Sequence, residues 1–239
     1  MAARRARQPL SRDRVLGAAL TVADAEGLAA VTMRRVAAEL DVEAMSLYHH
    51  VRGKEELLDG LVESIVGEIE IEIEAGRSSR TTSADAARAD SDHWRAALRR
   101  RCLTARTVMV RHPWAPGLIG SRSTIPAPLY PYFEEILATL IAGGFTYHLA
   151  HQGLHSLGSM ALGFAQELFS PADAGGNLDE EAAEAEFAAM AERLPHLTAM
   201  VAAELHDHDE DPLGWCDSQA EFEFTLDLLL DGLARRLAA

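Results

Sequence analysis

The stretch from Thr32 to Lys54 reads TMRRVAAELDVEAMSLYHHVRGK, and it decides the fold of the N-terminal region. Two short helices that cross steeply share a very small core. A helix-turn-helix therefore needs apolar residues at fixed positions and a small residue where its helices touch. Ala37 is that small residue, and the apolar positions are filled by Val36, Leu40, Val42 and Leu47. The stretch predicts a helix-turn-helix with helices over residues 33–40 and 44–50.

Thr32 and Asp41 agree with this prediction. Thr32 is a suitable N-cap, because its hydroxyl can accept a hydrogen bond from a backbone N–H of the first turn. The turn between the helices centres on Asp41, where we expect left-handed backbone. Aspartate tolerates that conformation better than most residues, at a cost of about 1 kcal/mol.

The second of these helices exposes most of its side chains, because a short helix has only one or two core anchors. Its N-terminal residues would enter the major groove, which has room for one helix. We expect Ala44 and Met45 to contact thymine methyl groups and Ser46 to donate to a base or a phosphate. The DNA-binding residues that we expect are Thr32, Met33, Arg34, Glu43, Ala44, Met45, Ser46, Tyr48, His49, His50 and Lys54.

The rest of the chain also has helical periodicity, and no two-residue alternation typical of strands is present. The pattern predicts an all-α protein with ten helices, a head over residues 1–56 and a body over residues 57–239. The ten helices are expected near 11–26, 33–40, 44–50, 54–75, 91–111, 114–120, 129–142, 146–169, 179–204 and 217–237. A loop is expected over residues 76–89, and the long helix at 54–75 joins head to body.

The charge is distributed unevenly along the chain. The net charge is −15, yet residues 1–56 carry nine Lys/Arg against eight Asp/Glu, whereas residues 57–239 carry thirteen against twenty-nine. Arg4, Arg5 and Arg7 form a basic arm that is either a solubilising terminus or a phosphate contact. The acidic body does not argue against nucleic acid, because the location of charge matters more than its sum.

Other classes of protein are not indicated. No apolar run reaches the ~18–20 residues that a membrane span needs. The first ten residues lack the apolar core of a secretory signal, so we expect a cytoplasmic protein with no membrane partner. Cys102 and Cys216 are isolated and predict neither a disulfide framework nor a metal site.

The segment AEGLAAVT, followed by MRRVAAELDVEAMSLYHHVRGKEELLDGL, resembles the DNA-binding domain of the tetracycline-repressor (TetR) family. The run SLYHHVRGKEELLD is the most specific part, because the family places a Leu-Tyr pair, an aromatic or His pair and a Lys there. The resemblance implies a homodimer whose recognition helices occupy successive major grooves of a palindromic operator, roughly 34 Å apart. It also implies repression that a small molecule relieves.

The body is similar to the C-terminal domain typical of tetracycline repressors, through Trp94 and its helix, residues 119–122 and residues 143–145. The positions that hold drug and magnesium there correspond here to Glu70, Arg101, Ala105 and Ile119. Since Ile119 replaces a metal-binding histidine, the resemblance does not imply a tetracycline–magnesium effector.

Large side chains of the body are candidates for the walls of an effector cavity, with plain core as the alternative for each. His151 and His155 have the i, i+4 spacing of metal ligands, but no acidic partner adjoins them, so we favour a pocket or interface role over a metal site. The candidate ligand-binding residues are Trp94, Leu98, Met109, Trp114, Ile119, Tyr132, His151, His155, Met160 and Phe164. We expect no metal and no cofactor, and the effector is unidentified.

The last helix predicts a homodimer independently of the resemblance, because leucines and phenylalanines surround most of it and need burial on nearly all sides. The helix at 146–169 carries Gly153, Gly158, Ala161 and Gly163, which allow another helix to approach. Two such helices from each subunit would form a four-helix bundle. A wholly intramolecular core is the alternative.

Two other functions remain open from the residues alone. An all-helical metal-dependent hydrolase would use the histidines and the string His206-Asp207-His208-Asp209, although a solvated turn explains that string better. An architectural DNA-binding protein without an effector is the second alternative. For a repressor, we expect the ligand to shift the helix at 91–111 and the segment near 114–120, which would pivot the long helix and move the head.

Overall fold

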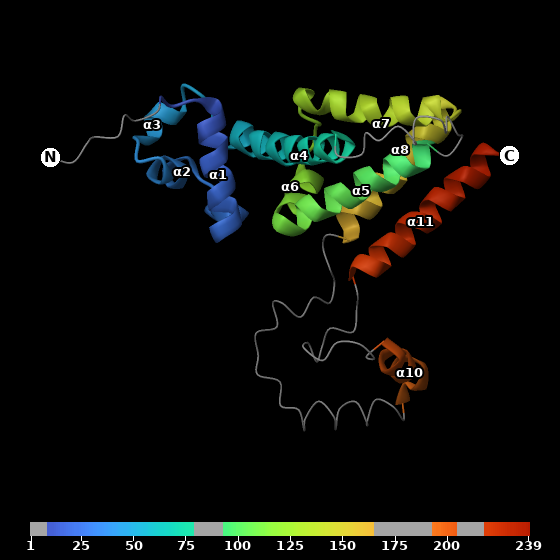
Figure 1. Cartoon of the computed structure of the whole chain (residues 1–239). Helices are drawn as coiled ribbons and strands as arrows, with labels where there is room; N and C mark the ends of the chain where they lie inside the picture. The colour runs from blue at the N-terminus through green and yellow to red at the C-terminus, as the bar shows by residue number, and fades with distance from the viewer. Residues whose placement is uncertain (1–8, 79–92, 165–192, 205–217) are drawn as a thin grey trace. The chain divides into compact units, whose positions relative to one another are not determined.

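The computed structural model describes residues 9–78, 93–164, 193–204 and 218–239, which form helices and connecting segments with no strand among them (Figure 1). The all-α class predicted from the periodicity is confirmed for these residues. The chain divides into two compact units, residues 1–166 with 226–239, and residues 167–225. Among the described helices, none is both long and apolar enough to cross a membrane.

The head begins with α1 (Arg12–Glu26), which is capped at both ends. The Arg14 backbone N–H donates to Ser11 Oγ at 3.3 Å, and Gly27 closes the helix with a φ of 80°. A single 3₁₀ turn, Leu28–Ala30, leads to α2 (Met33–Glu39) and α3 (Ala44–Leu47).

The body follows as a set of longer helices. The first is α4 (Lys54–Ser78), which packs against both α1 and α5. The others are α5 (His93–Arg111), α6 (Ala115–Ser121), a 3₁₀ turn (Ala127–Leu129), α7 (Tyr130–Ala142), α8 (Tyr147–Phe164), α10 (Pro195–Glu204) and α11 (Ser218–Leu237).

One hydrophobic cluster connects the head to the start of the body. Leu57 and Leu61 of α4 are fully buried together with Val15 of α1 and Leu118 of α6. Gly60 lets α1 and α4 approach closely, because a Cβ at this position would lie 2.4 Å from Leu16 Cδ2. The N-terminal end of α4 is therefore fixed to the head by packing.

Several predicted bounds are wrong. The recognition helix ends at Leu47 instead of residue 50, because the Tyr48 N–H bonds to the Met45 carbonyl and the following turn leaves α-helical geometry. The long helix continues through Gly76 to Ser78, since a single glycine costs a helix only about 1 kcal/mol.

The helix expected over 179–204 is interrupted at Leu194, and α10 starts at Pro195, which has no N–H to continue an earlier helix. Residues 179–192 of that expected helix, most of the expected loop at 76–89 and the end of the helix expected at 146–169 lie outside the described residues. The two 3₁₀ turns are additions that the periodicity did not indicate.

Candidate DNA-binding head and ligand cavity

The helix-turn-helix has the local geometry that its sequence predicts. The Arg35 N–H donates to Thr32 Oγ1 at 3.1 Å, which caps α2. Asp41 adopts left-handed backbone with a φ of 53°, and the Val42 N–H then bonds to the Ala37 carbonyl at 3.0 Å. Leu47 is fully buried and is the main anchor of α3 in the shared core.

The surface of α3 and its flanks exposes most of the predicted DNA-binding side chains. Met45 is 72% exposed and Tyr48 is 46% exposed. Two large exposed side chains so close together on a small folded head indicate an interaction surface. Met33 and Ala44 are half-buried and pack against the hydrophobic cluster, so they also support the fold. The exposed members of the set are Thr32, Arg34, Glu43, Met45, Tyr48, His49 and Lys54, while Ser46 and His50 are half-buried.

Arg35 forms ion pairs within the head, and none is shown for its neighbour Arg34. Its guanidinium bonds to Glu26 Oε1 at 2.6 Å and to Glu39 Oε2 at 2.9 Å, which ties α2 to the end of α1. The hydrogen bond from Arg35 lowers the pKa of Glu26, and the two carboxylates raise the pKa of Arg35. Arg34 is exposed on the same helix.

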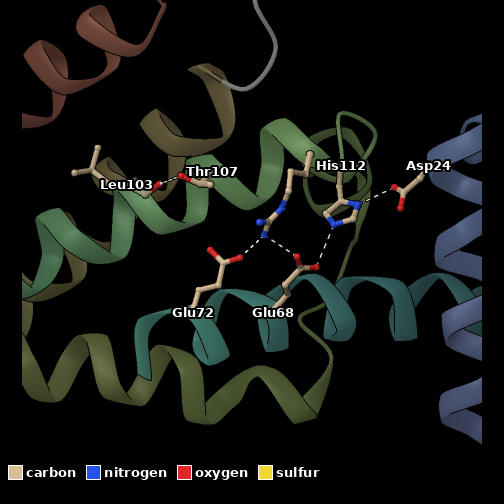
Figure 2. A network of polar contacts seen from close by, with 7 residues as sticks. Asp24, Glu68, Glu72, Leu103, Thr107 and His112 are labelled. Atoms are coloured by element: carbon tan, nitrogen blue, oxygen red, sulfur yellow. Dashed lines mark hydrogen bonds and ion pairs between the residues drawn. The ribbon is translucent and has the colours of Figure 1, made fainter. Parts of the chain in front are cut away.

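A polar junction joins α1, α4 and the end of α5, and the sequence reasoning missed it. His112 Nδ1 lies 2.7 Å from Asp24 Oδ1, and His112 Nε2 lies 3.1 Å from Glu68 Oε2 (Figure 2). Trp114 Nε1 donates to the same Asp24 oxygen at 2.7 Å. His112 is 7% exposed, so this contact between head and body is nearly buried. No local pattern marks it, since its partners lie 88 and 44 residues away.

Arg111 and Arg122 extend this junction along α4. Arg111 Nη2 donates to Glu68 at 2.6 Å and also to Glu72. Arg122, just after α6, pairs with Asp59 at 2.7 Å. A displacement of either end of α6 would therefore change contacts with α4.

A cavity of about 550 Å³ lies among α5, α7 and α8. Of the ten predicted ligand-binding residues, it brings together Leu98, Tyr132 and His155. Its other lining residues are Arg101, Cys102, Ala105, Ile125, Tyr130, Phe133, Glu134, Ile136, Leu137, Leu154, Leu157, Gly158, Ser159, Ala161 and Leu162. Most of these residues are apolar. The sequence predicted few of them, because the position of a residue on a helix face does not show which other helix that face packs against.

The other seven predicted residues lie elsewhere. Trp94 packs edge-to-face on Phe145 with ring centroids 4.8 Å apart, and Trp114 contacts Asp24 at the junction. Ile119 packs against the hydrophobic cluster of the head. Met109 and Met160 are buried in the body, His151 faces a groove described below, and the Phe164 carbonyl accepts from Arg106.

Arg101 is the main polar group of the cavity wall. Its side chain is 9% exposed, and its Nη2 donates to Glu135 Oε2 at 2.8 Å. The guanidinium carbon lies 4.7 Å from the centre of the Tyr132 ring, a cation–π contact. Its Nη1 is buried and has no hydrogen-bond partner among the described residues.

Two neighbours of Arg101, Cys102 and Tyr132, are neutral near pH 7 because their pKa values are raised. Burial raises the pKa of the Cys102 thiol to about 12, although the Arg101 charge acts in the opposite direction. Desolvation also raises the pKa of Tyr132, against the opposing influence of Arg101. The wall around Arg101 therefore combines apolar surface, these two neutral groups and one buried cation, and the rest of the lining adds polar atoms from Tyr130, Glu134, His155 and Ser159.

Comparison with known proteins identifies the family. Residues 15–61 match the model of bacterial regulatory proteins of the tetR family, and residues 87–237 match that of the tetracyclin repressor-like C-terminal domain. The chain belongs to the TetR family. Members of the TetR family are DNA-binding transcription factors, not enzymes, so the hydrolase alternative is not favoured.

Among its relatives, the chain is 35% identical to the HTH-type transcriptional repressor DrrR1 of Streptomyces coeruleorubidus over 137 residues. That alignment covers 57% of this chain and 46% of the repressor, so the chain spans about half the length of this relative. It is 31% identical to the Tetracycline repressor protein class E of Escherichia coli, with 66% of this chain and 68% of that protein covered.

Among solved structures, a possible TetR family transcriptional regulator from Streptomyces coelicolor A3(2) is similar, with 28% identity and a TM-score of 0.68. The similarity covers 94% of this chain and 99% of that one. TetR-family proteins bind operator DNA as dimers and respond to small-molecule ligands.

Two features of α8 bear on the dimer expected for a TetR-family chain. A groove between α8 and α11 is lined by residues that include His151, His155, Leu228 and Arg236, and Leu228 is 52% exposed. A Cβ at Gly158 would meet nothing within 4 Å, whereas one at Gly153 would lie 3.4 Å from Leu233 of the same chain. Gly153 therefore serves the intramolecular packing of α8 on α11.

Among the described residues, His151 and His155 are not shown to pair with a carboxylate. The rings of His151 and His155 contact each other with centroids 4.6 Å apart. In the part of the chain that the structure describes, no three His, Cys, Asp or Glu residues are grouped to hold a metal ion. The string at 206–209 lies outside the described residues.

Proposed function

We propose that this chain is a homodimeric transcriptional repressor that binds a palindromic operator through its head, residues 1–56, and is released by a small molecule bound to its body, residues 57–239. The exposed surface of α3 carries this proposal. A helix of four residues, fixed by one buried leucine, presents Met45 and Tyr48 to solvent beside the exposed cations Arg34 and Lys54. Such a surface fits the major groove and its flanking phosphates.

We assign the side chains of the head to two roles by their position. Ala44, Met45 and Ser46 lie at the N-terminal end of α3, where base edges are read. Tyr48 and His49 follow α3, and Lys54 begins α4, where the helix N-terminus also favours a phosphate. The first group sets sequence preference and the second sets affinity.

The groove between α8 and α11 is the surface that we assign to the second subunit. Leu228 projects from α11 with half of its surface exposed, and Gly232 in the same groove leaves room for a neighbouring helix, because a Cβ there would meet nothing within 4 Å. A two-fold axis at this groove would pair α8 and α11 with their copies in a four-helix bundle. The paired heads would then contact half-sites about one helical turn apart.

The polar junction provides a route from the cavity to the head. The cavity is lined by α5, and α5 ends at Arg111 beside His112, which contacts Asp24 of α1. A ligand that displaces α5 would alter this contact and the Arg111–Glu68 pair on α4. The ligand releases DNA only if it binds the displaced conformation more tightly than the DNA-bound one. DNA then weakens ligand binding by the same free energy by which the ligand weakens DNA binding.

Tetracycline with magnesium is not the effector that we propose. Ile119 stands where tetracycline repressors carry a metal-binding histidine, and its side chain packs against the hydrophobic cluster. A hydrocarbon side chain offers no atom to coordinate Mg²⁺. The effector is therefore a molecule that is recognised without a metal at this position. As a regulator of transcription, the protein would act in the cytoplasm.

Selection of duplexes from a random pool by the full chain tests this function. We expect enrichment of an inverted repeat whose half-sites are centred about one helical turn apart, roughly 10 base pairs. Enrichment of no sequence, with equal retention of all duplexes, would favour the architectural alternative instead.

A further inference from the structure

We propose that the effector is a planar aromatic acid, a molecule of two or three fused rings whose carboxylate or phenolate oxygen bonds to Arg101. This inference rests on the proposed function, because it names the chemical class of ligand for the same cavity. It is carried by the shape and polarity of the wall and by the unsatisfied donor of one buried side chain.

The size and walls of the cavity favour an aromatic framework. Its volume of about 550 Å³ lies within the range of roughly 300–1,000 Å³ typical of small-molecule sites. The innermost side chains are hydrocarbons, with Leu98 2% exposed, Ile136 7% exposed and Leu157 5% exposed. A ligand rich in hydroxyl or amide groups would lose hydrogen bonds to water against these walls. Hydrocarbon rings would not, and the aromatic side chains of the lining, Tyr130, Tyr132 and Phe133, favour flat aromatic ones.

Arg101 selects an oxygen acceptor. Glu135 occupies Nη2, while Nη1 is buried without a partner, and an unsatisfied buried donor is costly. Because Nη1 has almost no accessible surface, a ligand oxygen reaches it only when a neighbouring wall side chain shifts, and the new bond then removes that cost. An ionised oxygen forms a stronger and shorter bond than a neutral one because the charges assist it.

The charge around Arg101 favours an anion over a neutral acceptor. Glu135 is 56% exposed, so water weakens its compensation of the guanidinium. Cys102 and Tyr132 are neutral, and Glu134 lies on the exposed side of the cavity. The Tyr132 ring beneath the guanidinium also fixes its plane, which prepares the fork for a carboxylate.

A matched pair of fluorescent probes tests the inference on the full-length protein. Anthracene-2-carboxylate has the proposed rings and charge, and anthracene-2-carboxamide has the same shape without the charge. We expect the carboxylate to bind the wild type at least about tenfold more tightly in fluorescence titrations. Arg101→Met keeps the length of the side chain and removes its contacts with the exposed Glu135 and with Tyr132 without leaving a buried charge unpaired, so the variant should fold and lose this preference.

Two further variants separate recognition from packing. Glu135→Gln removes the competing carboxylate and should tighten carboxylate binding several-fold without affecting the carboxamide. Arg101→Lys keeps the charge but not the planar fork, so it should retain part of the preference. Equal binding of the two probes, a preference that survives Arg101→Met, or no carboxylate binding up to about 1 mM would overturn the inference.

Operator binding, measured in parallel by gel shift, distinguishes this inference from the proposed function. If the wild type binds its selected inverted repeat but does not prefer the carboxylate, only the ligand class is wrong. If the wild type shows the preference but binds no operator, the cavity assignment stands and the repressor function fails.

Discussion

Arg34 and Arg35 are adjacent on α2 and have the same chemistry, yet the structure gives them different surroundings. Arg35 joins Glu26 and Glu39 and ties two helices of the head, while Arg34 is exposed on the side of the predicted DNA contacts. At this scale a residue's role follows from its partners, since a guanidinium already paired with carboxylates is less available to a phosphate.

Arg35→Ala is expected to lower the thermal midpoint of unfolding at pH 7 and to leave DNA affinity less affected than Arg34→Ala. The pKa of Glu26 is lowered in the folded state, so its contribution is present above its ordinary pKa of 4.5 and is lost as the pH falls through the folded value. The difference in midpoint between wild type and Arg35→Ala should therefore shrink below about pH 4.5. A difference that grows under acid would contradict the Glu26 assignment.

Tyr48→Ala should weaken binding to all duplexes by about 5- to 30-fold, because we assign its side chain to a phosphate and not to a base. Fluorescence anisotropy on the selected operator and on a scrambled duplex measures both affinities. Ile71→Ala is the control, since Ile71 is 71% exposed on α4, far along the helix from its N-terminus. An unchanged affinity for Tyr48→Ala would count against the placement of α3 on DNA.

Cys102 should react very slowly with iodoacetamide at pH 8. Its pKa is raised to about 12 and the thiolate is the reactive form. We expect a rate at least about a hundredfold below that of the urea-unfolded chain, followed for the Cys102 peptide by mass spectrometry. A rate that levels off near pH 8.5 in the folded protein would show an ordinary, accessible thiol.

At the scale of elements, the sequence predicted most helices but few of their contacts. Periodicity located α1, α2 and α7 to within a residue or two, because each buries one apolar face at regular spacing. Periodicity predicted an end for α3 that lies too far along the chain. Neither Tyr48 nor His49 is a residue type that signals the end of a helix, so the sequence did not indicate the turn after Leu47.

Contacts between elements depend on long-range packing, which explains what was missed. Arg101 was noted from the resemblance but was not among the predicted ligand-binding residues, and its unsatisfied Nη1 becomes visible only when α5 and α7 are placed together. The Asp24–His112 contact is likewise absent from any local pattern. The head was more predictable than the cavity, because the head's constraints act over 23 consecutive residues, 32–54.

Asp24→Ala tests the junction between the head and the body. The change leaves His112 Nδ1 and Trp114 Nε1 without their acceptor, which should lower the free energy of unfolding by about 1–3 kcal/mol. Asp13→Ala, on the exposed face of the same helix, is the matched control. Equal losses in urea unfolding for the two variants would mean that the junction contributes nothing specific.

At the scale of the whole molecule, the account requires two heads acting together. One head offers a recognition helix of four residues, which contacts too few bases to select a site within a genome. The net charge of −15 also opposes general attraction to DNA, so binding depends on the local cations of each head. Pairing two heads on an inverted repeat supplies both the specificity and the affinity that one head lacks.

The number of chains on one operator tests this central claim most directly. Analytical ultracentrifugation of the full chain with its selected duplex measures the mass of the complex, and the same duplex with one half-site scrambled is the control. The account predicts two chains on the intact inverted repeat and a loss of at least about a hundredfold in affinity on the scrambled duplex. A single chain bound to the intact repeat, or equal affinity for both duplexes, would contradict it.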